Sequence, residues 1–170
     1  PKDNIRFSPE LRGGSLLDAG SYAVSACRFV LGEDPIRATG VRYDSGKYGV
    51  DTTFNGLLEF PRGTVAHISS SFQEPWRCEL IAIGSKGRIE TPQMLDESST
   101  VIINIGDSEE IETKRTSNRF RIQLDKFSEC VLSGKCPEFP AEDGLRNTAA
   151  LEALLLASEE GSVVDIESCH

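Results

Sequence analysis

The chain has 170 residues, of which 38% are hydrophobic and 26% are charged, and this is the composition of a globular protein, not of a disordered one. Its net charge of −9 argues against binding to nucleic acid, because contact with phosphates needs a basic face. The longest apolar helical candidate, residues 149–157, is interrupted by Glu152, so we expect no membrane-spanning helix.

The N-terminal part is predicted to form an extended segment followed by one helix. Residues 1–12 read as extended, and the helix occupies residues 13–32. Ser15, with Asp18 three residues later, marks a helix start close to a capping box. Gly32 falls where a helix ends in a residue of left-handed conformation, which glycine adopts without steric cost.

The middle of the chain is rich in strands. Residues 36–43 alternate enough to form one strand, and residues 54–60 and 66–72 form a hairpin around the turn at Pro61–Gly63. Further strands are predicted at residues 79–83, 88–91, 101–105 and 110–114. So many neighbouring hairpins indicate a mainly antiparallel sheet.

Two helices and a short strand complete the chain. The first helix covers residues 120–131, with Asn118 as its N-terminal cap and Gly134 as its stop. A long helix runs through residues 151–158, and residues 163–166 form a last strand. This order predicts an α+β fold, in which an open, mainly antiparallel sheet carries helices packed on one face.

The cysteines, histidines and glycines give little sign of a metal or nucleotide site. Five scattered cysteines without a C-x-x-C pair favour free thiols in a reducing compartment. His67 lies within a strand and His170 at the chain end, too few partners for a zinc site. Neither G-x-G-x-x-G nor G-x-x-x-x-G-K-[ST] occurs. We therefore expect a single cytoplasmic domain, residues 1–170, that holds no metal and no nucleotide of its own.

One stretch carries side chains suited to chemistry. Asp18 and Tyr22 are four residues apart, roughly 6 Å along a helix axis, so they can point into one pocket. Gly13 and Gly14 leave room before the helix, where free N–H groups favour oxygen-rich ligands. Two interpretations stay open: an amphipathic helix with an acidic first turn, or an acid/base tyrosine assisted by a carboxylate.

The same stretch resembles the start of the C-terminal domain of Gfo/Idh/MocA oxidoreductases. The resemblance is carried by Asn4–Phe7, Pro9–Leu11, Gly13–Gly14 and Leu17-Asp18-x-Gly20-x-Tyr22, and later by Gly84–Ile89 and Glu142–Asp143. These segments occur in the family's order and cover nearly the whole chain. A tyrosine where inositol dehydrogenases have histidine is similar to the branch of glucose–fructose oxidoreductase, xylose dehydrogenase and dihydrodiol dehydrogenase.

The resemblance implies a role for each candidate residue. Tyr22 matches the family's acid/base position, and Asp18 its aspartate, to which we assign orientation of the substrate or of Tyr22. Arg6, Gly13 and Gly14 are candidate substrate-binding residues. Arg12 is a further one, and it stands where the family commonly has a third glycine, so it either narrows the site or holds an acidic substrate.

The resemblance also implies a longer parent enzyme. In such enzymes a preceding Rossmann domain binds NAD or NADP and supplies a lysine from an E-K-P motif, and none of this is present here. We expect the parent to transfer a hydride between a sugar, polyol or diol and the nicotinamide, to form a homo-oligomer through the open sheet face, and to be inactive when reduced to this chain. The alternative is a non-catalytic sugar-binding or dimerising module.

Overall fold

The computed structural model describes residues 4–96, 98–115 and 118–167. They form two compact units, which are described separately. The first unit takes its residues from the chain up to Glu74 and from Ala141 onward, and the second covers Pro75–Pro140. That residues 1–170 act as a single domain for substrate binding and oligomerisation stays a prediction.

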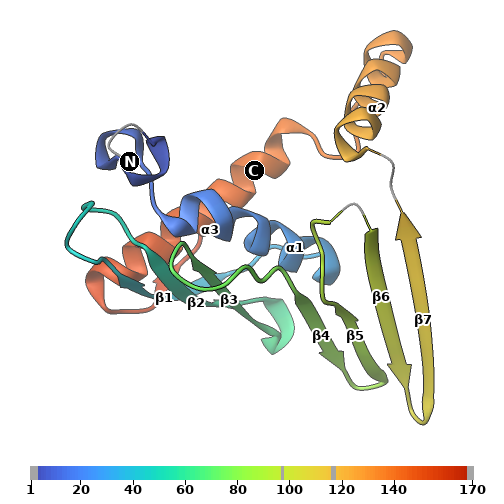
Figure 1. Ribbon diagram of the computed structural model, residues 1–170, viewed down its shortest axis with the longest axis horizontal. Helices are drawn as coiled ribbons and strands as arrows, with labels where there is room; N and C mark the ends of the chain where they lie inside the picture. The colour runs from blue at the N-terminus through green and yellow to red at the C-terminus, as the bar shows by residue number, and fades with distance from the viewer. Residues whose placement is uncertain (1–3, 97, 116–117, 168–170) are drawn as a thin grey trace. The chain divides into compact units, whose positions relative to one another are not determined.

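The first unit is a four-stranded antiparallel sheet with helices on one face (Figure 1). Its sheet has the order β3-β2-β1-β8. The strands are β1 (Arg37–Tyr43), β2 (Thr53–Glu59), β3 (Val65–Ser71) and β8 (Val164–Asp165). The helical elements are η1 (Ile5–Phe7), η2 (Pro9–Leu11), η3 (Leu16–Gly20), α1 (Ser21–Leu31), η4 (Pro61–Gly63) and α3 (Ala141–Glu160).

The core of this unit lies between the sheet and the helices. Leu16 and Val24 from the N-terminal helical stretch meet Phe54 and Leu58 of β2, and all four are fully buried with Leu154 of α3. Because successive strand residues point to opposite faces, Asn55 and Leu57 of β2 face away from the helices. The hairpin of β2 and β3, with its turn at η4, is therefore as predicted.

A glycine pair brings α3 close to the sheet. Gly40 of β1 and Gly56 of β2 are register partners in the antiparallel ladder. A Cβ atom on Gly40 would lie 2.7 Å from the carbonyl oxygen of Leu154, and one on Gly56 would lie 2.7 Å from the Leu154 side chain. The absence of side chains at both positions is what lets α3 pack against these strands.

The second unit contains a separate antiparallel sheet of order β4-β5-β6-β7, followed by α2. Its elements are β4 (Leu80–Gly84), β5 (Gly87–Thr91), β6 (Ser98–Ile105), β7 (Ser108–Arg115) and α2 (Arg119–Ser133). As predicted, Asn118 caps α2, since its side chain accepts from the Arg121 amide at 3.1 Å, and Gly134 ends it with φ 66°. The α+β class is thus confirmed.

The strands divide between two sheets, where the sequence predicts one. After β3 the Ser71 hydroxyl accepts hydrogen bonds from the amides of Gln73 and Glu74, and Pro75 follows. These contacts turn the chain, and proline cannot donate to a ladder, so the strand stops.

The prediction of an extended segment over residues 1–12 is wrong for the residues that the structure describes there. They form the two 3₁₀ turns η1 and η2. The Asn4 side chain accepts from the Arg6 amide at 3.0 Å, and Pro9 occupies the first position of η2, where proline is well tolerated. The alternation of apolar and polar residues in Ile5–Phe7 is typical of a strand, but three residues are too few to distinguish a strand from a 3₁₀ turn.

The remaining predictions concern membranes and thiols. Within the described ranges, no helix is both long enough and apolar enough to cross a membrane. Cys27, Cys78, Cys130 and Cys136 are free thiols, and Cys169 lies outside the described residues, as does His170.

Candidate functional site

The candidate site is built on a π-helical turn that leads into α1. Leu16–Gly20 form the π turn η3, and α1 begins at Ser21. Leu16 and Gly20 are buried, whereas Asp18 lies between them on the outer side and Tyr22 is 56% exposed. Because single π turns in helices are frequent at functional sites, this local geometry is compatible with the second interpretation of the sequence.

The start of this helical stretch is capped from a distant segment. Ser15 makes no capping hydrogen bond to the turn, so the prediction of a local capping box is wrong. Its hydroxyl instead donates to Oδ2 of Asp51 at 2.6 Å, and the Leu16 amide donates to the same oxygen at 2.9 Å. Asp51, which lies in the segment that leads into β2, therefore caps the start of this helical stretch. No local pattern in the sequence links Ser15 to a residue so far away, so the capping role of Asp51 was not predicted.

The amides before the helix all have acceptors within the protein. Gly13 N–H donates to Ser8 O at 2.8 Å, Gly14 N–H to Arg6 O at 2.9 Å, and Ser15 N–H to Asp51 O at 2.9 Å. The expectation of free N–H groups is therefore wrong for Gly13, Gly14 and Ser15. Substrate binding by Gly13 and Gly14 stays a prediction.

The two glycines have a packing role that the structure makes explicit. Gly14 has φ 119°, and a Cβ atom on it would collide with Oδ1 of Asp51. A Cβ atom on Gly13 would collide with the carbonyl oxygen of Arg6. Both positions therefore need glycine for the chain to pass beside Arg6 and Asp51.

Two of the candidate residues meet in the structure. Nε of Arg6 donates to Oδ2 of Asp18 at 2.9 Å, with the two side chains 51% and 36% exposed. Arg12 is directed elsewhere, since its Nη1 lies 3.7 Å from a carboxylate oxygen of Glu152 on α3. Tyr22 follows Asp18 in the next turn, without a role in this ion pair.

A buried arginine fixes α1, and with it Tyr22, to α3. The Arg28 side chain is only 6% exposed. Its Nε donates to Asp34 at 2.7 Å and its Nη2 to Asp143 at 2.8 Å, while Asn147 donates to the carbonyl oxygen of Ser21 at 3.4 Å. The helix that carries Tyr22 is therefore held at both ends. The role of Arg28 was likewise not predicted from the sequence.

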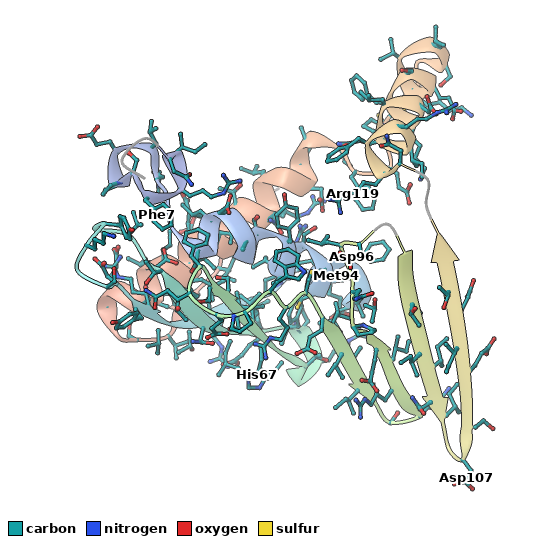
Figure 2. The ribbon with its side chains drawn as sticks, viewed as in Figure 1. Phe7, His67, Met94, Asp96, Asp107 and Arg119 are labelled. Atoms are coloured by element: carbon teal, nitrogen blue, oxygen red, sulfur yellow. The ribbon has the colours of Figure 1, made fainter. Side chains whose placement is uncertain are left out.

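An aromatic cluster lies next to Arg6 in the chain. The Phe7 ring centroid is 4.4 Å from that of Tyr48 and 5.2 Å from that of Phe72 (Phe7 is labelled in Figure 2). These contacts tie η1 to the loop between β1 and β2 and to the end of β3. They hold Arg6 in place beside Asp18.

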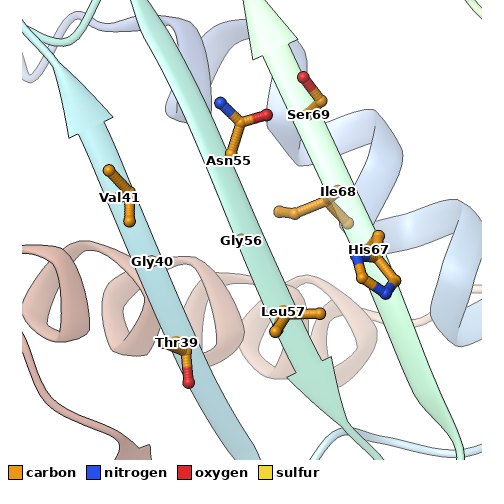
Figure 3. Close-up of a pocket in the computed structure, with 9 residues that line it drawn as sticks. All are labelled: Thr39, Gly40, Val41, Asn55, Gly56, Leu57, His67, Ile68 and Ser69. Atoms are coloured by element: carbon orange, nitrogen blue, oxygen red, sulfur yellow. The ribbon is translucent and has the colours of Figure 1, made fainter.

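The face of the sheet away from the helices carries an open hollow of about 330 Å³ (Figure 3). It is lined by Thr39, Gly40, Val41, Asn55, Gly56, Leu57, His67, Ile68 and Ser69. His67 is exposed there, as the sequence predicts (Figure 2). Across the described parts of the chain, three or more His, Cys, Asp or Glu side chains do not gather in a group that could hold a metal ion.

The fold and the helix start agree with the resemblance drawn from the sequence. The family model described as "GFO/IDH/MocA C-terminal domain" matches residues 1–90. The chain belongs to the Gfo/Idh/MocA family of oxidoreductases and corresponds to its C-terminal domain.

Sugar and diol oxidoreductases are among its relatives. The chain is 30% identical to D-xylose 1-dehydrogenase (NADP(+)) 2 of Haloferax volcanii, covering 97% of this chain and 52% of that protein. It is 34% identical to trans-1,2-dihydrobenzene-1,2-diol dehydrogenase of Xenopus laevis, over 56% of this chain and 29% of the relative.

A solved structure shows the same fold over nearly all of the chain. The aldose-aldose oxidoreductase of Caulobacter crescentus, complexed with glycerol, superposes with a TM-score of 0.88 at 28% identity. The match covers 97% of this chain and 51% of that one. The chain thus spans about half the length of the relatives that it matches from end to end.

Proposed function

We propose that the chain is the substrate-binding and dimerisation half of an NAD(P)-dependent oxidoreductase that acts on a hydroxyl group of a sugar, polyol or diol. The observation that carries the proposal is the position of Tyr22. It is exposed on the first turn of α1, directly after the π turn that bears Asp18, in a member of this oxidoreductase family.

In the proposed reaction, Tyr22 takes the proton of the substrate hydroxyl as the carbon is oxidised, and returns it in the reverse direction. The hydride that leaves the same carbon would be accepted by a bound nicotinamide cofactor. Asp18, held by Arg6 at 2.9 Å, accepts a hydrogen bond from the substrate and so orients the hydroxyl toward Tyr22. Asp18 thus acts by orientation.

This chain's own residues do not suit the phosphates of a dinucleotide at the helix start. The amides of Gly13, Gly14, Ser15 and Leu16 all donate to oxygen atoms of the protein. The exposed Tyr22 suits contact with a ring held by another domain. We accordingly assign the binding of NAD or NADP to a preceding domain. We assign the binding of the substrate to this chain.

The charges around the helix start support an uncharged substrate. Arg6 is paired with Asp18, and Arg12 lies within ion-pair distance of Glu152. With each cation next to a carboxylate, the local charge is balanced, and a polyhydroxy compound can exchange hydrogen bonds with both. Of the two roles predicted for Arg12, this arrangement favours narrowing the site over holding an acidic group.

The first test is the source DNA upstream of the Pro1 codon. An open reading frame that encodes a G-x-G-x-x-[GA] turn and an E-K-P motif would support the proposal. A start codon beside Pro1, preceded by a stop codon, would contradict it and leave the non-catalytic module as the better proposal.

The second test is the conservative variant Tyr22→Phe in the longer enzyme, assayed with aldoses and diols and with both nicotinamide cofactors. We expect kcat to fall by about 100-fold or more, since acid/base groups contribute at that scale. Tyr43→Phe is the matched control, because Tyr43 is 57% exposed but lies on β1. Equal turnover of Tyr22→Phe and the wild type would refute the assignment. The isolated chain is expected not to catalyse hydride transfer.

The second candidate function is a non-catalytic dimerising module, favoured by the exposed face of the sheet. Val41 and Val65 on β1 and β3 are 69% and 49% exposed, close to the hollow around His67. Sedimentation of the chain tests pairing through this face. We expect a dimer that Val65→Lys dissociates and that Val131→Lys, on α2, does not. A wild-type chain that stays monomeric at high concentration would count against pairing.

A further inference from the structure

Three buried polar side chains lie together under the π turn. Ser15, Asp51 and Ser70 are 0%, 4% and 8% exposed. They come from three segments: the helix start, the approach to β2, and β3. The mechanism proposed above uses none of them, although buried polar groups are costly unless they are well satisfied.

Their hydrogen bonds hold the beginning of the turn. Oδ2 of Asp51 accepts from the Ser15 hydroxyl at 2.6 Å and from the Leu16 amide at 2.9 Å. The carbonyl oxygen of Asp51 accepts from the Ser15 amide at 2.9 Å. The Ser15 hydroxyl also lies 3.2 Å from Ser70 O, and Ser70 Oγ lies 3.3 Å from Ser15 Oγ. Ser15 is thus fixed from both its backbone and its side chain.

The end of the turn rests on the same network. Gly20, the last residue of the π turn, lies so close to β3 that a Cβ atom on it would be 3.3 Å from Ser70 Oγ. Ser70 is therefore hydrogen-bonded to Ser15, which directly precedes the turn, and lies beside Gly20, which ends it. A turn that is packed in this way at both ends cannot easily exchange its π conformation for the regular α-helix.

That exchange would matter for the site. A π turn holds one residue more than an α turn, so its loss would shift the residues before it by one position, or about 100° of rotation about the axis. Asp18 would then leave Arg6 and change its direction relative to Tyr22. A satisfied buried polar network is well suited to prevent this, because it specifies one arrangement where an apolar contact would not.

We propose that Asp51 is a positioning residue: with Ser15 and Ser70 it holds the π turn that sets Asp18 against Arg6 and directs it relative to Tyr22. The effect of Asp51 on catalysis rests on the proposed function. The structural part concerns this chain alone. It can therefore be tested without an active enzyme.

The test uses NMR on the whole chain and compares Asp51→Ala, Asp51→Asn and Ser15→Ala. Asp51→Asn keeps an oxygen acceptor for the Leu16 amide and serves as the conservative rescue. Thr52→Val is the matched control, since Thr52 is 1% exposed and bonded to Tyr43 O, away from the turn. Two signals are followed: hydrogen exchange of the Leu16 amide and the Arg6 Nε–H resonance, which reports the ion pair with Asp18.

For Asp51→Ala we expect Leu16 exchange to accelerate about tenfold or more, which is the scale of a lost buried acceptor. The protected Arg6 Nε–H signal should be lost in the same variant, with weaker changes in Ser15→Ala and recovery in Asp51→Asn. Thr52→Val should leave both signals unchanged. An intact Arg6 signal in folded Ser15→Ala and Asp51→Ala would overturn the proposal. If Asp51→Ala does not fold, an unchanged Leu16 exchange rate in Ser15→Ala would overturn it.

Kinetics of the longer enzyme separate this inference from the proposed function. We expect Asp51→Ala to lower kcat about tenfold with little change in KM, and Asp51→Asn to restore most of it, as for a misplaced acid/base group. An inactive Tyr22→Phe beside a fully active Asp51→Ala would refute the positioning role alone. A fully active Tyr22→Phe would refute the proposed function, while the NMR result would still decide whether Asp51 holds the turn.

Discussion

The glycine pair under α3 gives a prediction that can be worked out from distances. An alanine at Gly40 would place its Cβ atom 2.6 Å from Cζ of Phe54 and 2.7 Å from the backbone oxygen of Leu154. An alanine at Gly56 would meet mainly Cδ2 of Leu154, at 2.7 Å. Backbone cannot yield without moving the helix, whereas the end of a leucine side chain can rotate. Gly40→Ala should therefore cost more than Gly56→Ala.

The expected magnitudes follow from overpacking. Forcing a methyl group into a filled core costs about 1–3 kcal/mol, and alanine recovers about 0.5–1 kcal/mol because it has less freedom in the unfolded chain than glycine. We expect net losses in free energy of unfolding of about 2 kcal/mol for Gly40→Ala and about 1 kcal/mol for Gly56→Ala. Gly144→Ala is the matched control: Gly144 lies in α3 with no atom within 4 Å of an added Cβ, so the same change should stabilise.

The assay is urea unfolding of the whole chain, followed by far-ultraviolet circular dichroism and by tyrosine fluorescence. The order of midpoints should be Gly144→Ala, wild type, Gly56→Ala and Gly40→Ala, from most to least stable. All three positions belong to the first unit, so the comparison is made within one structure. A Gly40→Ala chain as stable as the wild type would show that α3 does not approach the sheet as closely as these distances require.

Three further changes test separate contacts. Arg28→Met should lower the free energy of unfolding by about 2–4 kcal/mol, because it leaves Asp34 and Asp143 without their buried partner, and urea unfolding would measure it. Burial raises the pKa of the Cys27 thiol. The stabilisation that the neutral thiol gives the folded state should be complete below the pKa of the unfolded thiol, about 8.5, and should be lost as the pH rises through the higher pKa of the folded state. Cys27→Ser should remove this decrease in the free energy of unfolding at alkaline pH. Arg12→Gly should raise the free energy of unfolding by up to about 1 kcal/mol, because Arg12 has φ 52°, a left-handed conformation that glycine adopts at lower cost. A lower melting temperature for this variant would refute the prediction.

The strands and the helices of the second half were predictable because each is specified locally. The alternation of residue types along β2 and β3 predicted their hairpin, and Asn118 and Gly134 marked the ends of α2. The spacing of Asp18 and Tyr22 is equally local, so these two residues could be named as candidates from the sequence, and their roles stay predictions. The family to which the chain belongs was identified from the sequence as well.

The parts that escaped prediction depend on contacts between distant residues. Asp51 caps a helix that starts 35 residues earlier, and Arg28 binds Asp143, 115 residues later. The π turn also left no trace in the sequence, because its apolar residues fit an ordinary α-helical period. Such features arise only when the elements pack together, which no local pattern encodes.

Strand β3 connects the candidate site to the proposed pairing surface. Ser70 points inward, is hydrogen-bonded to Ser15 just before the π turn and lies beside Gly20 at its end, while its neighbour Ser69 points outward and lines the hollow. Successive strand residues face opposite sides, so a displacement of β3 at one face is a displacement at the other. If two copies pair through the open face, they would therefore fix the strand on which the π turn rests. Pairing and catalysis would then be coupled through one strand, and Val65→Lys, which is expected to dissociate the dimer, should also weaken the Arg6–Asp18 contact.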